Sequence, residues 1–229
     1  MEFVQLIIDL LHDPRDFIAQ WIVQLGPVWV YTPLFLIIFM ETGLVVTPFL
    51  PGDSLLFCAG IFAADGGGLN IVALISLMAA AAVLGNTSNY WIGRKVGEVI
   101  VRSGKVKALS PENLEKSQKI LDKYGSLAVF LTRFFPIIRT IAPFCAGMGE
   151  MSFRRFTLFN VLGAVVWVSL FSLLGYFFGG VPFVQKHFEL VIVGIVVISL
   201  VPAVAGAIKA KHSSSKKKKQ AAAAAAEEE

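Results

Sequence analysis

Four long stretches of this chain contain no Asp, Glu, Lys or Arg, and this pattern limits the folds open to it. The charge-free stretches are residues 17–40, 66–93, 156–185 and 190–208. A helix that crosses a bilayer needs roughly 20 mostly apolar residues, and each stretch is long enough. One soluble core could not hide four such segments from water. We therefore predict an all-α integral membrane protein.

Composition supports the same prediction. Hydrophobic residues make up 56% of the chain and charged residues only 16%, whereas a soluble domain has about 25% charged residues. The net charge of +4 is concentrated in two places, Arg94–Lys123 and the C-terminal tail, so it indicates topology and not a nucleic-acid partner. Cys58 and Cys145 lie inside apolar runs and are expected to be buried thiols.

The chain divides into three parts. Residues 1–27 are predicted to be an N-terminal interfacial helical region, 28–208 a membrane transport domain, and 209–229 a disordered low-complexity tail. Within the transport domain we expect a first repeat at about 28–93, a cytoplasmic basic linker at 94–124, a second repeat at about 125–180, and a last span at 187–208.

Two apolar segments are interrupted, while residues 71–93 and 156–179 read as uninterrupted spans. Pro48 and Pro51 break the first segment, because proline removes a donor and clashes with the preceding turn. The second segment, residues 126–149, is interrupted by Arg133, Pro136, Arg139 and Pro143. Irregular backbone within a membrane is tolerated only where protein or water satisfies its polar groups.

Lys and Arg predict the orientation. Arg94–Lys123 and the tail carry most of them, so both are expected in the cytoplasm, and the C-terminus with them. The spans 156–179 and 187–208 already supply the even number of crossings this requires. Residues 126–149 are therefore predicted to enter and leave on one side, as a re-entrant hairpin. Two arrangements stay open for the N-terminal part: either residues 17–40 cross, or residues 28–64 form a hairpin open to the periplasm.

An internal repeat supports this topology. Phe57-Cys58-Ala59-Gly60 recurs as Phe144-Cys145-Ala146-Gly147, and Tyr90-Trp91-Ile92-Gly93 recurs loosely as Tyr176-Phe177-Phe178-Gly179. Each copy combines a broken apolar segment with one span, so the second copy would be inverted in the membrane. In secondary transporters with inverted repeats, broken helices meet near the midplane and form the substrate site.

Four ionisable residues lie within or beside the breaks: Glu41, Asp53, Arg133 and Arg139. Each costs about 2.5–3.5 kcal/mol at a helix centre on insertion scales, so we expect the acidic pair to meet the basic pair. Arginine suits phosphate because its planar fork donates two parallel hydrogen bonds. Arg133 and Arg139 are therefore the candidate substrate-binding residues, and Glu41 and Asp53 the candidate proton-coupling residues. The alternative is that all four form structural salt bridges.

Other residues are assigned to the shape of the site. Pro48, Pro51, Gly52, Pro136 and Pro143 are expected to shape it, and Asn86, Tyr90 and Asn160 to line it or to join helices. Arg94, Lys95, Arg154 and Arg155 are expected to be interfacial anchors. No nucleophile motif or metal-ligand spacing occurs in the sequence, so we expect no cofactor, no metal, no catalytic residue and no enzymatic activity.

Several of these motifs occur together and in order: Glu41-Thr42-Gly43; Pro48-Phe49-Leu50-Pro51-Gly52-Asp53-Ser54; Gly85-Asn86 with Tyr90 and Gly93-Arg94; Phe130-x-x-Arg133-x-x-Pro136-x-x-Arg139; Ala146-Gly147; and Asn160 with Gly163 and Trp167. In this the chain resembles the DedA family of bacterial inner-membrane proteins, in the SNARE-associated/VTT-domain superfamily. One departure is Asn86, where many relatives have an acidic residue.

The resemblance implies a location in the bacterial inner membrane and a role in envelope homeostasis and cell division that depends on the proton motive force. It also implies transport of undecaprenyl phosphate or another phospholipid, with the four charged residues essential. We therefore expect a proton-linked transporter of an anionic lipid whose partners are membrane lipids and protons, as a monomer or a homo-oligomer. Two alternatives stay open: a proton-coupled carrier of small cations or drugs, and a non-transporting factor for export or division machinery.

Overall fold

The computed structural model describes residues 14–44, 52–64, 68–104, 109–135, 138–149 and 151–181, with the single residues 106, 184 and 194. Every regular element in these ranges is helical, as the sequence predicts. The predictions for residues 1–11, Pro48, Pro51, Pro136, the last span at 187–208 and the tail lie outside the described part or almost wholly so.

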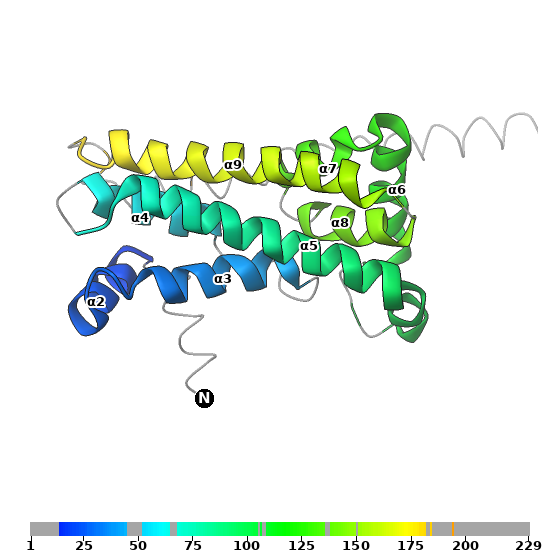
Figure 1. The fold of residues 1–229 in the computed structure, drawn as a ribbon, viewed down its shortest axis with the longest axis horizontal. Helices are drawn as coiled ribbons and strands as arrows, with labels where there is room; N and C mark the ends of the chain where they lie inside the picture. Colours follow the sequence, from blue (N-terminus) through cyan, green and yellow to red (C-terminus); the bar gives the residue numbers. More distant parts are fainter. Residues whose placement is uncertain are drawn as a thin grey trace, which may run out of the picture.

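Two long helices run the length of the molecule and lie side by side (Figure 1). These are α5, Ile71–Ser103, and α9, Phe153–Phe178. Both are long and apolar enough to cross a membrane by length and composition. They carry the predicted spans, but each begins or ends beyond its predicted limits.

The helix α5 continues ten residues past the predicted end of its span at residue 93. It begins at Asn70, whose side chain accepts hydrogen bonds from the backbone N–H groups of Val72 and Ala73 at 2.9 and 3.0 Å, which is N-capping. It ends only at Gly104, with φ of 63°. Residues 94–103 of the predicted linker are therefore helix, because charge alone does not end a helix outside the membrane.

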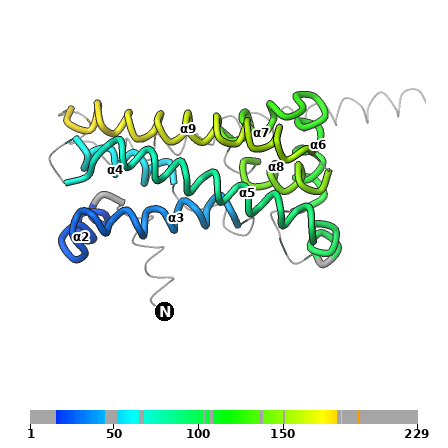
Figure 2. The backbone as a smooth tube through the Cα atoms, in the orientation of Figure 1, coloured from blue at the N-terminus to red at the C-terminus, as the bar shows by residue number. Residues whose placement is uncertain are grey.

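Short helices pack around these two. α2 spans Pro14–Leu25, α3 spans Tyr31–Gly43, α4 spans Gly52–Ala64, α7 spans Leu127–Leu131, the 3-10 turn η2 spans Thr132–Phe134, and α8 spans Ile138–Met148. Residues 17–40 thus hold two helices, separated at Gly26, which has φ of 83°. The tube in Figure 2 shows α3 and α4 toward the end where α5 begins, and α7 and α8 toward the end where it finishes.

Among the described residues of the second broken segment, the helical structure is interrupted at Phe135, after η2. Arg139 and Pro143 both lie inside α8, so the prediction that they break the segment is wrong. Pro143 lacks an N–H, which deprives the Arg139 carbonyl of its usual helical donor, but the helix continues to Met148.

The amphipathic helix α6, Pro111–Tyr124, covers one end of the molecule (Figure 1). Ser110 caps it by accepting from the Asn113 N–H at 3.4 Å, and Pro111 occupies its first position, where proline is favoured. Its outer face carries the ion pairs Glu112–Lys116 at 2.7 Å and Glu115–Lys119 at 2.5 Å. Its buried Leu121 joins an apolar cluster with residues of α5, α8 and α9.

Glycines allow the short helices to reach the backbones of the long ones. On the α4–α9 contact, a Cβ on Gly60 would overlap the Ser172 carbonyl, and one on Gly175 would overlap the Phe57 carbonyl. On the α5–α8 contact, a Cβ on Gly147 would overlap the Tyr90 carbonyl, and the same holds between Gly93 and Phe144. Each short helix is therefore seated directly against the main chain of a long helix.

Candidate functional site

The four predicted charged residues all lie at the ends of short elements. Glu41 is in the last turn of α3, Asp53 in the first turn of α4, Arg133 in η2, and Arg139 in the first turn of α8. Because helix N-termini favour negative charge, the position suits Asp53 and opposes Arg139. The two breaks therefore bring acidic and basic groups to the interior, where they need partners from other elements.

Arg139 binds both carboxylates. Its Nη1 donates to Asp53 Oδ1 at 2.9 Å, and its Nη2 donates to Glu41 Oε1. The backbone N–H of Gly52 also donates to Glu41 Oε1, at 3.3 Å. A Cβ on Gly52 would overlap the Glu41 carboxylate, so this position admits only glycine without rearrangement. The structure thus brings Glu41, Asp53 and Arg139 together, as expected from the sequence.

Arg133 has different partners. Its Nη2 donates to the Asn160 side-chain oxygen at 2.7 Å, and it is 3% exposed. The ion pairs found in the described residues do not include one to Arg133. The two arginines, expected to act alike, are therefore held in different ways: one by carboxylates, the other by neutral amides.

Asn86 and Asn160 form the amide side of the site. We assign the Asn86 amide so that its oxygen accepts from Arg133 Nη2 at 2.7 Å and its nitrogen donates to the Thr42 carbonyl at 3.2 Å. The nitrogen of Asn160 donates to the Val83 carbonyl at 3.1 Å. Both asparagines are buried, and they join α5, α9 and η2 around the Arg133 guanidinium.

Trp167 was not predicted as a site residue. Its Nε1 donates to Asp53 Oδ1 at 2.9 Å, and its ring centroid lies 5.7 Å from Arg133 Cζ and 5.4 Å from Arg139 Cζ. Both distances are within the range of cation–π contacts. It appears in the sequence motif, but an aromatic residue in an apolar span is ordinarily core, so spacing alone did not single it out.

Asn89 was also missed. It is buried, and its Nδ2 donates to the Thr140 carbonyl at 2.6 Å, tying α5 to α8 beside Arg139. The available signal was a run of four polar side chains in α5, at residues 86–89, inside an otherwise apolar span.

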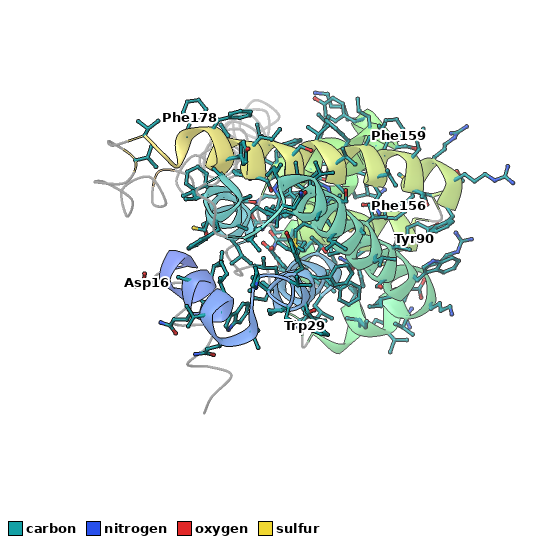
Figure 3. The ribbon with its side chains drawn as sticks, turned by 60° about the vertical axis from the view of Figure 1, so that its left-hand side comes forward. Asp16, Trp29, Tyr90, Phe156, Phe159 and Phe178 are labelled. Atoms are coloured by element: carbon teal, nitrogen blue, oxygen red, sulfur yellow. The ribbon has the colours of Figure 1, made fainter. Side chains whose placement is uncertain are left out.

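Tyr90, predicted to line the site or to join helices, joins helices. Its hydroxyl donates to the Met151 carbonyl at 2.5 Å and accepts from Arg94 Nη1 at 2.8 Å. Its ring stacks on Phe156 with centroids 4.5 Å apart, and Figure 3 shows the two near the N-terminal end of α9. Tyr90 therefore fastens α5 to the start of α9, away from the four charges. Pro143 lies one turn beyond Arg139 in α8.

Comparison with known proteins identifies the family. The VTT domain model matches residues 50–177. Protein DedA of Escherichia coli strain K12 is 46% identical over 215 residues, which cover 93% of this chain and 98% of that protein. Inner membrane protein YghB of the same strain is 34% identical, covering 77% of this chain and 80% of that protein.

A further relative is an uncharacterized membrane protein of Mycobacterium tuberculosis strain H37Rv, 38% identical over 76% of this chain and 77% of its own. No solved structure matches the chain. The extent and identity of these matches, and the membrane location printed in the relatives' names, show that the chain belongs to the DedA family of VTT-domain membrane proteins.

Proposed function

We propose that this protein moves an anionic lipid headgroup between the leaflets of the bacterial inner membrane, with undecaprenyl phosphate as the first candidate substrate. The observation that supports this proposal is that two buried arginines have different kinds of partner. Arg139 is bound by the carboxylates of Glu41 and Asp53, whereas Arg133 is held by amides and an aromatic ring. One guanidinium is thus left to meet the charge of a phosphate.

The proposed topology is an inverted repeat. In it, α3 with α4 and α7 with α8 are re-entrant hairpins that open to opposite sides, and α5 and α9 are the membrane-spanning helices. The end that carries α6 is cytoplasmic, as is the C-terminus. Three observations support the proposal: the paired short helices lie toward opposite ends (Figure 2), the breaks carry the charges, and the glycine contacts are reciprocal.

Phosphate binding would begin at Arg133. Its side chain is already fixed, so little rotamer freedom is lost when it binds an oxyanion. Amide oxygens hold a guanidinium without neutralising it, so a guanidinium that touches no carboxylate is available to a ligand of opposite sign. Arg139 would complete the site once a carboxylate releases it.

Protons would control that release. The Oε2 atom of Glu41 is buried and makes no hydrogen bond within the described residues. A proton bound there would weaken the attraction of Glu41 for Arg139, and the guanidinium could then turn to phosphate. Carboxylate and phosphate would compete for one guanidinium, so proton uptake and lipid binding would be linked.

The test is reconstitution in liposomes that contain a fluorescent polyprenyl phosphate, with an impermeant quencher reporting the outer leaflet. Wild-type protein should accelerate exchange between leaflets, and a pH gradient should bias it. Arg139→Lys, which keeps the charge but loses the planar fork, should slow exchange about tenfold or more. Arg154→Lys, on the exposed start of α9, is the matched control. Wild-type exchange by Arg139→Lys would contradict the proposal.

The geometry favours an anion over a cation as substrate. A carrier of small cations needs a carboxylate that faces the cation, but Glu41 and Asp53 both bind Arg139. If the protein were instead a proton-coupled carrier of small cations, Glu41→Gln would abolish cation-driven proton flux in the same liposomes. A non-transporting role would instead depend on α6, and then deletion of residues 111–124 would abolish that role although the wild-type protein exchanges no lipid.

A further inference from the structure

Trp167 contacts Asp53, Arg133 and Arg139, which have different roles in the proposed function: Asp53 in proton coupling and the two arginines in phosphate binding. Its N–H and the Arg139 Nη1 both donate to the same oxygen, Oδ1 of Asp53, each at 2.9 Å. The faces of the same indole lie within cation–π distance of both guanidiniums. The side chain is 1% exposed and is thus surrounded by protein.

The rest of the inner face of α9 is fitted to Arg133. Asn160, two turns before Trp167, accepts from Arg133 Nη2. Gly163, one turn before Trp167, leaves room for the arginine side chain: a Cβ there would lie 3.3 Å from Arg133 Nε. One face of α9 thus supplies Arg133 with a hydrogen-bond acceptor and with space for its side chain. The same face presents an indole to both arginines and to Asp53.

We propose that Trp167 is a positioning residue that couples the proton-binding side of the site to the phosphate-binding side. Its N–H keeps the Asp53 carboxylate against Arg139. Its π surface lies within cation–π distance of both guanidiniums and holds each of them in place. This inference rests on the proposed function, and it assigns to α9 the link between the two steps.

Two arguments support a task beyond filling space. A carboxylate that accepts from both an indole N–H and a guanidinium is fixed in direction, whereas packing alone would need only an apolar ring. An aromatic face is also among the few neutral surfaces that stabilise a desolvated cation, and two cations share this one. Leucine or phenylalanine could fill the space, but neither supplies both interactions.

The first experiment separates the two interactions in the liposome assay. Trp167→Phe keeps an aromatic face and loses the N–H. The concentration of polyprenyl phosphate that gives half the maximal rate should therefore stay within about threefold of the wild-type value. The maximal rate, and its stimulation by a pH gradient, should fall about tenfold. Trp167→Leu loses both, so that concentration should rise as well. Trp91→Phe, the same change at a half-exposed position of α5, should match wild type.

A second experiment does not depend on transport. The chain has four tryptophans, and a variant with Trp21, Trp29 and Trp91 replaced by Phe reports on Trp167 alone. In this background, Asp53→Asn should shift the fluorescence emission of Trp167, because a charge bonded to the indole is removed. Asp122→Asn, on the exposed face of α6, should leave it unchanged.

The outcomes distinguish the two proposals. If wild-type protein moves no polyprenyl phosphate, the proposed function fails, and the fluorescence still tests the link between Asp53 and Trp167. If wild-type protein transports and Trp167→Phe matches it in maximal rate and gradient stimulation, the positioning role alone is overturned. An unchanged emission in Asp53→Asn would also overturn it.

Discussion

Arg133 is a buried guanidinium whose hydrogen bonds go to neutral oxygens, whereas a buried charge usually binds a group of opposite charge directly. The oxygens of Asn86 and Asn160 each lie 2.7 Å from its Nη2. These oxygens accept hydrogen bonds from Arg133 without cancelling its charge. The charge of the side chain at position 86 therefore determines whether Arg133 can still attract an anion.

This arrangement predicts the effect of Asn86→Asp. The new carboxylate would lie against Arg133 and neutralise it, so the protein should bind polyprenyl phosphate about tenfold or more weakly and unfold at the same or a higher temperature. Equilibrium binding in detergent and thermal unfolding would measure the two effects.

Gln118→Glu, an equal change of charge on the exposed face of α6, is the control for altered net charge. Wild-type affinity in Asn86→Asp would show that Arg133 does not receive the phosphate. A lower unfolding temperature would show that the substitution disrupts the site and does not pair with it.

A second prediction concerns the acidic side. Glu41→Gln keeps the shape and the acceptor oxygen but removes the charge, leaving Arg139 paired with Asp53 alone. Lipid exchange should persist at a reduced rate but lose most of its dependence on a pH gradient, because a proton-binding group is gone. Exchange rates at equal and unequal pH across the liposome would measure this. Full gradient dependence in Glu41→Gln would exclude Glu41 as the proton site.

At this scale the charged residues could be predicted because ionisable groups are rare inside membranes and need partners. The unequal partners of the arginines could not be predicted, since they depend on which helix face meets η2. Trp167 could not be singled out either: whether its N–H finds a carboxylate depends on the rotation of α9 against α4.

At the scale of elements, the contacts of α4 with α9 and of α5 with α8 depend on glycine. In both, the Gly of a Phe-Cys-Ala-Gly sequence lies against a long helix, and a glycine of that long helix, Gly175 or Gly93, lies against the Phe carbonyl. The sequence comparison matched Gly93 with Gly179, but the contacts match it with Gly175. Aromatic neighbours produced that alignment, whereas close backbone approach decides the packing.

The α4–α9 contact predicts that Gly175→Ala destabilises the protein. The added Cβ would overlap the Phe57 carbonyl, and main chain cannot rotate away as a side chain can, so we expect a loss of about 1–3 kcal/mol. Thermal unfolding in detergent would measure it. At Gly180 a Cβ would meet nothing within 4 Å, so Gly180→Ala should change stability by less than about 0.5 kcal/mol. Equal unfolding temperatures for the two variants would contradict the close contact.

At the scale of the whole molecule, helix length and membrane thickness differ. The 33 residues of α5 extend about 50 Å at 1.5 Å per residue, compared with about 30 Å of hydrocarbon. The sequence predicted where the apolar part ends, because that depends on charge, but not where the helix ends, because that depends on Gly104. The surplus carries Arg94, Lys95 and Arg102 toward the end that α6 covers.

The orientation of the protein in the membrane can be tested by labelling cysteines placed at its two ends. A membrane-impermeant maleimide should label Ala64→Cys, at the far end of α4 from α6, in intact cells, and should label Gln118→Cys, in α6, only after the membrane is opened. Both positions are exposed. Cys58 and Cys145 are buried free thiols, as predicted, so the unsubstituted chain supplies the background. Labelling of both variants from the same side would contradict the proposed topology.

The interior cluster contains two carboxylates and two guanidiniums, and with all four ionised their charges sum to zero. A transmembrane voltage acts on net charge, by about 2.3 kcal/mol per elementary charge per 100 mV. The empty site would therefore feel almost no electrical force, and binding a proton or a phosphate would create the net charge on which the voltage acts. Membrane potential would then act on the protein in any state in which the bound charges do not cancel, and leave the unloaded one free to reset.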